Sequence, residues 1–428
     1  MSELDRLERK RARLTPEQLA ALERRLAARP VVEPPQPAPP PSAPVRDLGG
    51  APALSLPWDA VVAAGERAAE PVPGGGVSAT TLNALLDELA VAAIAGGLRA
   101  AGAYGTDGEV HDADELGARL GLDPDRGRLL RRCMLTLEAA GVLVPAPAGL
   151  AAPRALREAP LDPLAAEVRA LTEGTPYQAL AEAVVLGATR FADILLGRLT
   201  GQDVFFAGGD GGLAERAYSE PPEARQTLRV LAAMVAAVQA GAPRERPLRV
   251  LELGAGLGIA TAVVLPLLGP GTAYLFTDVS SYFLDRALGR FGGTSAALDV
   301  AIADLDSEVP AAGVAPGSFD MVVAAASVHC ARSVPRALGH ARAALRSGGL
   351  LVLVEPTEPR RWHDVSTALI SGLPDFEDER AARCQPFLGA GAWLSALRGA
   401  RFEPAHAVPA RDAEGRALGH HVLAAIAA

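Results

Sequence analysis

Hydrophobic residues recur in two patterns along the chain, and the pattern changes near residue 240. From Ser78 to Leu150, and again from 161 to 240, apolar residues recur at spacings of three and four, which predicts amphipathic helices. From Leu248 to Val354, short apolar runs alternate with helical stretches, which predicts a parallel sheet with right-handed crossovers. The expected later strands are Leu298–Ala303, Phe319–Ala325 and Leu350–Val354, with a closing hairpin formed by Phe402–Val408 and His421–Ala427.

Part of the first helical region predicts a small winged-helix-like unit within about residues 80–150. A helix over Asp114–Leu122 is followed by a second helix and then by the apolar run Ala140–Val144. Such units often bind DNA, and the segment Asp123–Arg132 is rich in arginine. The whole chain carries 41 basic and 50 acidic residues, a net charge of −9, which disfavours binding to a polyanion. We therefore expect no nucleic-acid partner, and a DNA-binding regulator remains only a weak alternative.

The N-terminal segment differs in composition from the rest of the chain. Residues 1–29 are charged and amphipathic, and Thr15-Pro16 has the form of a helix start. Residues 30–77 are rich in proline and predict an extended linker. The helix is either a docking element or a solvated tail. The expected organisation is completed by a helical lid or substrate region over 78–240 and a ligand-binding core over 241–428.

Composition narrows the possible chemistry and location. The sequence has no uninterrupted apolar stretch of about 18 residues and no apolar signal segment at its start, so we expect a cytoplasmic protein without a membrane partner. Its three cysteines are widely spaced and predict neither a disulfide framework nor a metal site. Lys10 is the only lysine, which excludes a lysine Schiff base and a phosphate-binding Walker lysine from the rest of the chain.

A glycine-rich run after the first predicted strand carries the strongest chemical signal. It reads Glu252-Leu253-Gly254-Ala255-Gly256-Leu257-Gly258, and a second strand ends at Asp278. Glycines let the backbone approach a ligand, and an acid after the second strand is placed to accept hydrogen bonds from a ribose diol. The spacing differs from the G-x-G-x-x-G turn that seats a pyrophosphate, and Glu252 would repel one. An ordinary strand-to-helix turn is the alternative.

The E-x-G-x-G-x-G run resembles motif I of class I methyltransferases, whose ligand S-adenosylmethionine is cationic and has no phosphate. We therefore expect an α/β fold: a Rossmann-like class I methyltransferase core with a helical N-terminal lid region that contains the winged-helix-like unit. The expected cofactor-binding residues are Glu252, Gly254, Gly256, Asp278, Asp304 and Leu305. After the third strand, Asp304 would accept the adenine amino hydrogen and the Leu305 amide would reach a ring nitrogen; for each acid, a helix cap or loop residue is the alternative.

Two further residues follow the fourth and fifth strands. His329 lies after the fourth and Glu355 ends the fifth. Tips of adjacent strands lie close together, so the carboxylate can hydrogen-bond to the imidazole, fix its tautomer and raise its basicity. His329 is therefore the candidate general base, with Glu355 as its partner and no metal required. A histidine with a purely structural role is the alternative.

The segments quoted above, with Tyr274–Ser280, the Gly317–Asp320 turn and Glu355-Pro356-Thr357, resemble the methyltransferase domains of modular polyketide synthases. The resemblance covers about residues 80–428. It implies methyl transfer from S-adenosylmethionine to an acyl chain held on an acyl carrier protein, most often at the α-carbon of a β-ketoacyl thioester. It also places His329 and Glu355 at the family's catalytic pair, and Tyr218 in a lid over the acyl substrate.

The chain departs from the family pattern beside the histidine. Ala326 stands where the family usually has asparagine, and Cys330-Ala331 replaces a small Ala-Thr pair. Methylation of oxygen, rather than carbon, and a noncatalytic scaffold with a degenerate fold therefore remain open. The implied partners are an acyl carrier protein and, through the N-terminal helix, other synthase subunits.

Overall fold

The computed structural model describes residues 56–71, 76–157, 160–209, 211–242, 246–294, 296–307, 315–412 and 415–428. The docking helix predicted over 1–29 and most of the predicted linker lie outside these residues. Within the predicted linker, however, Trp58–Ala68 forms helix α3. Its Val61 is fully buried and joins the same core cluster as Met234. The linker therefore does not extend through residue 77 as an unbroken extended segment.

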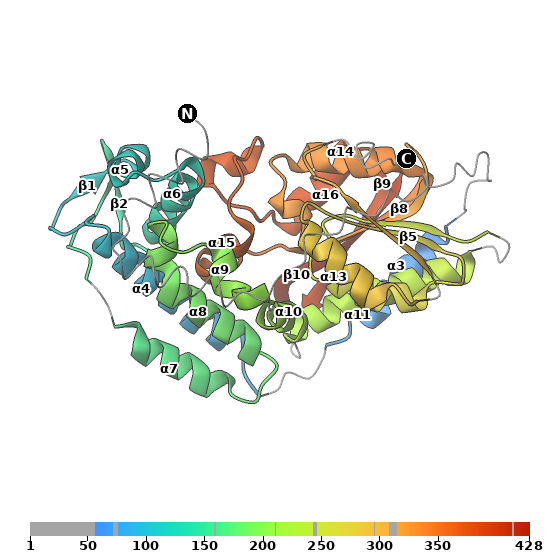
Figure 1. Ribbon diagram of the computed structural model, residues 1–428, viewed down its shortest axis with the longest axis horizontal. Helices are drawn as coiled ribbons and strands as arrows, with labels where there is room; N and C mark the ends of the chain where they lie inside the picture. Colours follow the sequence, from blue (N-terminus) through green and yellow to red (C-terminus); the bar gives the residue numbers. More distant parts are fainter. Residues whose placement is uncertain are drawn as a thin grey trace, which may run out of the picture. The chain divides into compact units, whose positions relative to one another are not determined.

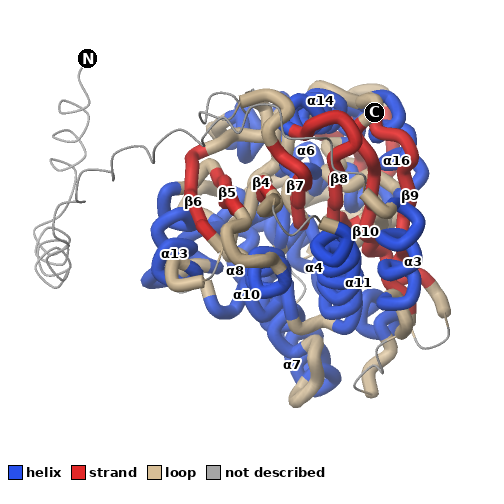
Figure 2. The backbone as a smooth tube through the Cα atoms, turned by 90° about the vertical axis from the view of Figure 1, so that its right-hand side faces the viewer, coloured by secondary structure: helices blue, strands red, loops and turns tan. Residues whose placement is uncertain are grey.

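The centre of the structure is a seven-stranded sheet in the order β6-β5-β4-β7-β8-β10-β9 (Figure 2). All neighbouring strands are parallel except that β10 is antiparallel to both β8 and β9. The strand order reverses between β4 and β7, so a crevice is expected beyond the carboxyl ends of these two strands. The strands are β4 (Arg249–Glu252), β5 (Ala273–Asp278), β6 (Ala297–Ile302), β7 (Phe319–Ala325), β8 (Leu345–Pro356), β9 (Phe402–Arg411) and β10 (Ala417–Ala427).

Helices cover both faces of this sheet. Alternate strand residues point to opposite sides, so Val250 joins one core cluster and its neighbour Leu251 joins the other. Helices α3, α11, α12 and α13 pack on the first face, and α14 and α16 pack on the second. These helices are α11 (Pro222–Gly241), α12 (Ile259–Val264), α13 (Ser281–Phe291), α14 (Val334–Ala344) and α16 (Ala390–Gly399). The predicted strands and the closing hairpin are confirmed.

A helical region lies beside the carboxyl ends of the sheet (Figure 1). Its core includes a segment from far along the chain, because Trp362 and Leu369 are buried in the same cluster as Leu86. Trp362 Nε1 donates to Asn83 Oδ1 at 2.8 Å, and Arg132 Nε donates to Asp364 Oδ1 at 2.9 Å. The region comprises α4 (Ala79–Ala100), α5 (Ala113–Leu120), α6 (Pro124–Ala139), α7 (Leu161–Thr172), α8 (Gln178–Leu195), α9 (Gly201–Phe205), α10 (Gly212–Ser219) and α15 (Thr367–Ser371).

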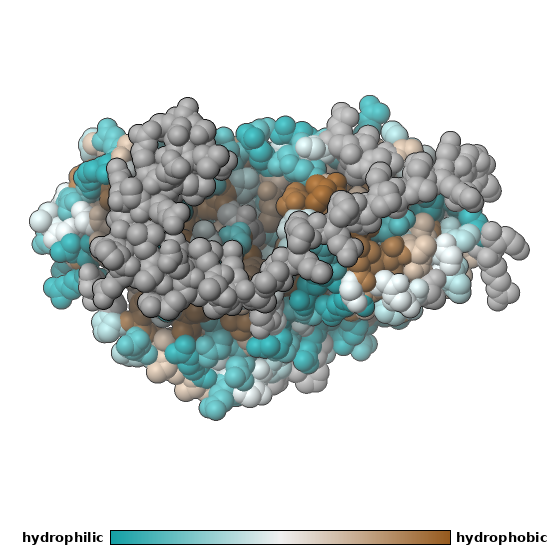
Figure 3. Space-filling view, in the orientation of Figure 1, coloured by the Kyte–Doolittle hydropathy of each residue, from teal (hydrophilic) through white to brown (hydrophobic). Residues whose placement is uncertain are grey.

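The packed units therefore do not divide at residue 240, where we expected the helical region to end and the core to begin. Helix α11, from the predicted lid region, packs on the sheet, whereas the segment with α15, from the predicted core, packs among the lid helices (Figure 1). Among the residues that the structure describes there are also five short 3-10 helices: Ala207–Gly209 (η1), Leu265–Leu267 (η2), Val328–Cys330 (η4), Arg361–Val365 (η5) and Glu379–Arg383 (η6). Where the described surface is visible in Figure 3, mostly hydrophilic residues surround a few hydrophobic patches.

Helix α4 is long and apolar enough, by length and composition, to cross a membrane. Its leucines explain that composition differently, because Leu82, Leu86 and Leu89 are buried against the other lid helices. The apolar face is therefore accounted for by the helical core.

Beside α4, helices α5 and α6 precede a small antiparallel sheet in the order β1-β3-β2. Asp112 and Asp123 cap the two helices through their side chains. These are the elements expected of a winged-helix-like unit, and assignment to that class remains a prediction. The strands are β1 (Val110–His111), β2 (Val144–Ala146) and β3 (Gly149–Ala151).

Candidate active site

The glycine run forms the turn between β4 and α12. Gly254 and Gly256 have φ angles of 59° and 51°, in the left-handed region that side chains disfavour. A Cβ on Gly254 would lie 2.6 Å from the Ser327 Cβ, so a side chain there would clash with the loop after β7. A Cβ on Gly256 would meet open space, which leaves this backbone accessible to a ligand. Both glycines line a cavity at this edge of the sheet.

Glu252 lies beneath this turn and is almost completely buried. Its Oε2 accepts hydrogen bonds from the Thr261 hydroxyl at 2.6 Å and the Tyr274 hydroxyl at 2.5 Å. Burial raises the pKa of Glu252 to about 7, although both hydroxyls oppose that shift. Glu252 thus ties the turn to α12 and β5 and also lines the cavity.

The other predicted cofactor residues lie along the same edge of the sheet. Asp278, at the end of β5, is buried and accepts hydrogen bonds from the amides of Gly256 and Ser280, both at 2.9 Å. Asp304 is exposed on the loop after β6, where its Oδ1 accepts from the Asp306 amide at 2.9 Å. Leu305 lies beside Gly254, and its carbonyl oxygen is 3.1 Å from His340 Nδ1. Their roles in cofactor binding remain predictions.

The structure brings the predicted base and its carboxylate together. His329 lies in the short helix η4 after β7, and Glu355 lies near the end of the adjacent strand β8. His329 Nδ1 is 2.7 Å from Glu355 Oε2, while Glu355 Oε1 accepts from the Val328 amide at 2.9 Å. The exposed fractions are 3% for His329 and 0% for Glu355. Glu355 therefore uses both oxygens to fix the imidazole and the backbone that carries it.

The surroundings of His329 favour its protonated form. Burial lowers the pKa of His329, but the neighbouring Cys330 and the Glu355 carboxylate outweigh burial and raise it to about 10. The imidazole is therefore a stronger base than an isolated histidine, and it carries a proton at neutral pH. Cys330, one of the two departures from the family pattern, thus contributes to the electrostatics of this site.

Ala326, the other departure, has a strained backbone. Its φ is 50°, a left-handed conformation that asparagine and glycine adopt more readily than alanine. Its amide donates to the Val354 carbonyl at 2.7 Å, and the next residue, Ser327, donates its hydroxyl to the Leu253 carbonyl at 2.9 Å. These contacts hold the left-handed turn that leads from β7 to His329.

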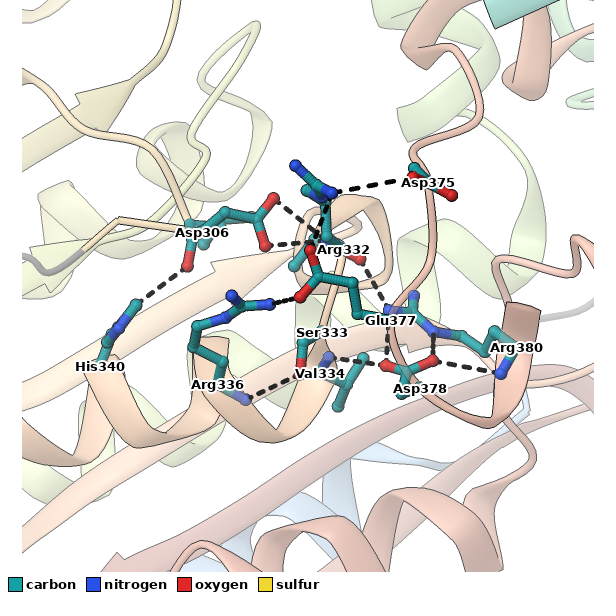
Figure 4. Close-up of polar contacts among 12 residues, drawn as sticks. Asp306, Arg332, Ser333, Val334, Arg336, His340, Asp375, Glu377, Asp378 and Arg380 are labelled. Atoms are coloured by element: carbon teal, nitrogen blue, oxygen red, sulfur yellow. Dashed lines mark hydrogen bonds and ion pairs between the residues drawn. The ribbon is translucent and has the colours of Figure 1, made fainter. Parts of the chain in front are cut away.

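Arg380, which the sequence did not single out, pairs with Asp378 (Figure 4). It also holds the other side of the loop that carries His329. Its guanidinium donates to the carbonyl oxygens of His329 and Ala331, both at 2.7 Å. Asp378 accepts two hydrogen bonds from the same guanidinium at 2.8 Å, and one from the Val334 amide at 2.9 Å. The pair lies in the segment between β8 and α16, which follows Glu355. Arg380 is a buried cation whose charge and donors are matched by these oxygens.

A cavity of about 240 Å³ is lined by Glu252, both glycines and His329, whereas Asp278, Asp304 and Leu305 are not among its lining residues. Tyr218 of α10 lines it, and burial raises the pKa of Tyr218 to about 12; its role in substrate binding remains a prediction. Residues that the sequence did not assign as site residues contribute much of the wall. They come from the lid helices, from the segment after β8 and from β10, and include Phe206, Glu223, Trp362, His363, Thr367, Phe387 and His420. The pocket is thus bounded by the glycine turn, the His329 loop and the helical region.

Comparisons with known proteins identify the chemistry of this fold. Residues 251–351 match the family model described as a methyltransferase domain. The polyketide synthase ThaG of Burkholderia thailandensis is 35% identical over 292 residues, 67% of this chain, and pyochelin synthetase PchF of Pseudomonas aeruginosa is 31% identical over 322 residues, 73% of this chain. The chain spans only 5% of the first relative and 18% of the second.

Solved structures match over a larger share of their length. The CurJ carbon methyltransferase is 26% identical with a TM-score of 0.75, and the match covers 82% of this chain and 93% of that one. The citrinin polyketide synthase CMeT domain, 20% identical with a TM-score of 0.70 over 88% of this chain and 100% of that one, shares the fold. The chain is accordingly an S-adenosylmethionine-dependent methyltransferase of the polyketide-synthase type, with a Rossmann-like class I fold.

Proposed function

We propose that this S-adenosylmethionine-dependent methyltransferase methylates the α-carbon of a β-ketoacyl thioester carried by an acyl carrier protein. The observation that carries the proposal is the buried contact of 2.7 Å between His329 Nδ1 and Glu355 Oε2, at the wall of a cavity that also borders the glycine turn. A base beside a methyl-donor site can activate a weak carbon acid.

The residues present fit the cofactor. The open space above Gly256 leaves backbone available for close approach, and Gly254 and Gly256 both face the cavity. Glu252, the glycine turn and Asp278 would hold the amino-acid and ribose parts, while Asp304 and Leu305 would hold the adenine. Bound S-adenosylmethionine supplies an electrophilic methyl group on a sulfonium ion.

His329 and Glu355 would generate the nucleophile. Glu355 keeps the proton of the neutral imidazole on Nδ1, so Nε2 has the free electron pair that removes the α-proton of the acyl chain. A β-ketoacyl α-carbon suits this base because the resulting charge is delocalised onto two carbonyl oxygens. The apolar residues around the cavity exclude water, which would otherwise solvate the enolate and weaken its attack.

The proposed partners come from the relatives, which are parts of polyketide and related synthases. The acyl carrier protein would deliver the substrate from the lid side of the cavity, and Tyr218 would contact the acyl chain. Docking to other synthase subunits through residues 1–29, and location in the cytoplasm, complete the proposal.

The decisive experiment uses matched 3-oxoacyl and 3-hydroxyacyl chains on an acyl carrier protein. We expect methylation of the 3-oxoacyl chain only, with the added methyl on the α-carbon in mass spectra and NMR of the product. A methyl ether or enol ether would overturn the carbon assignment. His329→Ala should abolish turnover while calorimetry still detects S-adenosylmethionine binding; full turnover by this variant would remove the base assignment.

A further inference from the structure

A second imidazole borders the same cavity. His363 lies in η5 and has an exposed fraction of 5%. Its ring centroid is 4.5 Å from that of Phe387, and the His329 centroid is 4.9 Å from the same phenyl ring. Trp362 also contacts the His363 ring, with centroids 4.0 Å apart. Both imidazoles are thus held beside one aromatic ring at the cavity wall.

The hydrogen bond to His363 defines its tautomer. The backbone amide of Arg360 donates to His363 Nδ1 at 3.2 Å. An amide N–H can only donate, so Nδ1 must be the acceptor nitrogen and the proton of the neutral ring must lie on Nε2. No other residue in the described ranges accepts a hydrogen bond from Nε2. The ring therefore offers one N–H donor that the protein itself does not use.

The electrostatic surroundings keep this ring neutral. Burial lowers the pKa of His363 well below its usual value, and the nearby basic groups of His420, His329, Arg360 and Arg132 lower it further. The two imidazoles of the cavity are thus tuned in opposite directions. One has a carboxylate partner and gains a proton, whereas the other has a backbone N–H partner and stays neutral. Opposite tuning of two titratable groups in one site is typical of divided catalytic roles.

We propose that His363 is a catalytic residue that donates a hydrogen bond from Nε2–H to the acyl carbonyl oxygen on which the enolate charge develops. This inference rests on the proposed function and adds a second residue to its chemistry. His329 Nε2 takes the α-proton, the C–H electron pair forms the carbon–carbon double bond of the enolate, and the carbonyl π pair moves to oxygen, where His363 stabilises the charge. The enolate carbon then forms a bond to the methyl group as the sulfur–methyl bond breaks, its electron pair remaining on sulfur. The proton on His329 passes to solvent.

A neutral donor suits this role better than a cation. A neutral imidazole N–H stabilises an oxyanion without giving up its proton, so the enolate keeps its charge for the attack on methyl. An imidazolium in the same place would tend to protonate the oxygen and leave a neutral enol, a weaker nucleophile. The hydrogen bond from Arg360 to Nδ1 thus sets both the direction and the charge state of the donor.

The test compares two variants of similar shape, His363→Gln and His363→Met, because only glutamine retains an N–H donor. The substrate is the 3-oxobutanoyl thioester of N-acetylcysteamine. We expect kcat for methyl transfer to fall about 100-fold in His363→Met and to stay within about tenfold of wild type in His363→Gln, as for loss of one oxyanion donor. Calorimetric affinity for S-adenosylmethionine should be unchanged in both. His406→Gln, on β9, is the matched control, since His406 pairs with Glu66 and does not line the cavity.

A second readout isolates enolate formation from methyl transfer. In D₂O with S-adenosylhomocysteine bound, wild type should exchange the α-protons of the thioester faster than the uncatalysed background, and His363→Met should lose this acceleration. Equal turnover and exchange in wild type and His363→Met would overturn the role of His363, as would equal losses in the two variants. Wild-type methylation on oxygen, without accelerated exchange, would instead overturn the proposed function itself.

Discussion

Replacing Glu355 by glutamine tests the proposed catalytic pair, His329 and Glu355, most directly. Glu355 uses both oxygens, one for the Val328 amide and one for His329 Nδ1. Glutamine has the same shape but only one acceptor oxygen. The Val328 amide can only donate, so the glutamine oxygen must remain with it, and the glutamine NH₂ group then faces Nδ1. The imidazole must reverse its tautomer, which places its proton on Nε2 and blocks the base.

The size of the effect follows from this reversal. A positioned general base contributes about 10² to 10⁴ in rate, so we expect kcat to fall roughly 10³-fold, or about 4 kcal/mol of barrier. The pH dependence should change as well. With the pKa of His329 at about 10, the neutral base, and therefore wild-type kcat, should increase about tenfold per pH unit from pH 7 to 9. In Glu355→Gln, burial is no longer offset by the carboxylate, so the inflection should move to lower pH.

The assay measures methyl transfer to a 3-oxoacyl carrier substrate between pH 6 and 10, with S-adenosylmethionine affinity measured by calorimetry. Glu167→Gln is the matched control, because Glu167 is an exposed carboxylate on α7 and its loss should leave kcat unchanged. If Glu355→Gln retains kcat within fivefold and the wild-type pH profile, the carboxylate does not set the tautomer and the reasoning fails.

Three further predictions concern the His329 loop. Cys330→Ala should lower the pKa of His329 and so move the inflection of the kcat-versus-pH profile to lower pH. An unchanged kcat-versus-pH profile would show that Cys330 has no electrostatic effect on His329. Ala326→Gly should raise the free energy of unfolding by about 1 kcal/mol, because glycine relieves the strain of the left-handed backbone. Ala325→Gly, in β7, should lower the free energy of unfolding. Urea denaturation of both variants measures the two changes, and a loss of stability in Ala326→Gly would refute the strain. Arg380→Ala should reduce kcat about 10- to 100-fold at unchanged S-adenosylmethionine affinity, because misplacement of a catalytic group has an effect of this order. Arg380→Lys should recover part of the lost kcat. Equal kcat in wild type and Arg380→Ala would refute the role of Arg380 in positioning His329.

Local patterns were sufficient for the core of the methyltransferase fold. The strand runs, the glycine turn and the closing hairpin could be predicted because each depends on neighbours in sequence: alternation of side chains, or a backbone that only glycine adopts freely. The contact between His329 and Glu355 could also be predicted, because the carboxyl ends of adjacent parallel strands meet at one edge of the sheet. The same logic placed Asp278 and Asp304 at that edge but did not foresee that neither lines the cavity and that Asp304 is exposed.

The remaining features depend on contacts between residues far apart in the chain. No local signal shows that Asp364 pairs with Arg132, or that α3 packs with α11 instead of extending a linker. These contacts place the segment after β8 among the lid helices, and with it His363 and Phe387 beside His329. The sequence by itself therefore determined the fold class, the glycine turn and the contact between His329 and Glu355. Only the tertiary structure decided the walls of the cavity and the place of the second imidazole, because burial and partner groups, not local pattern, determine whether the pKa of a histidine rises or falls.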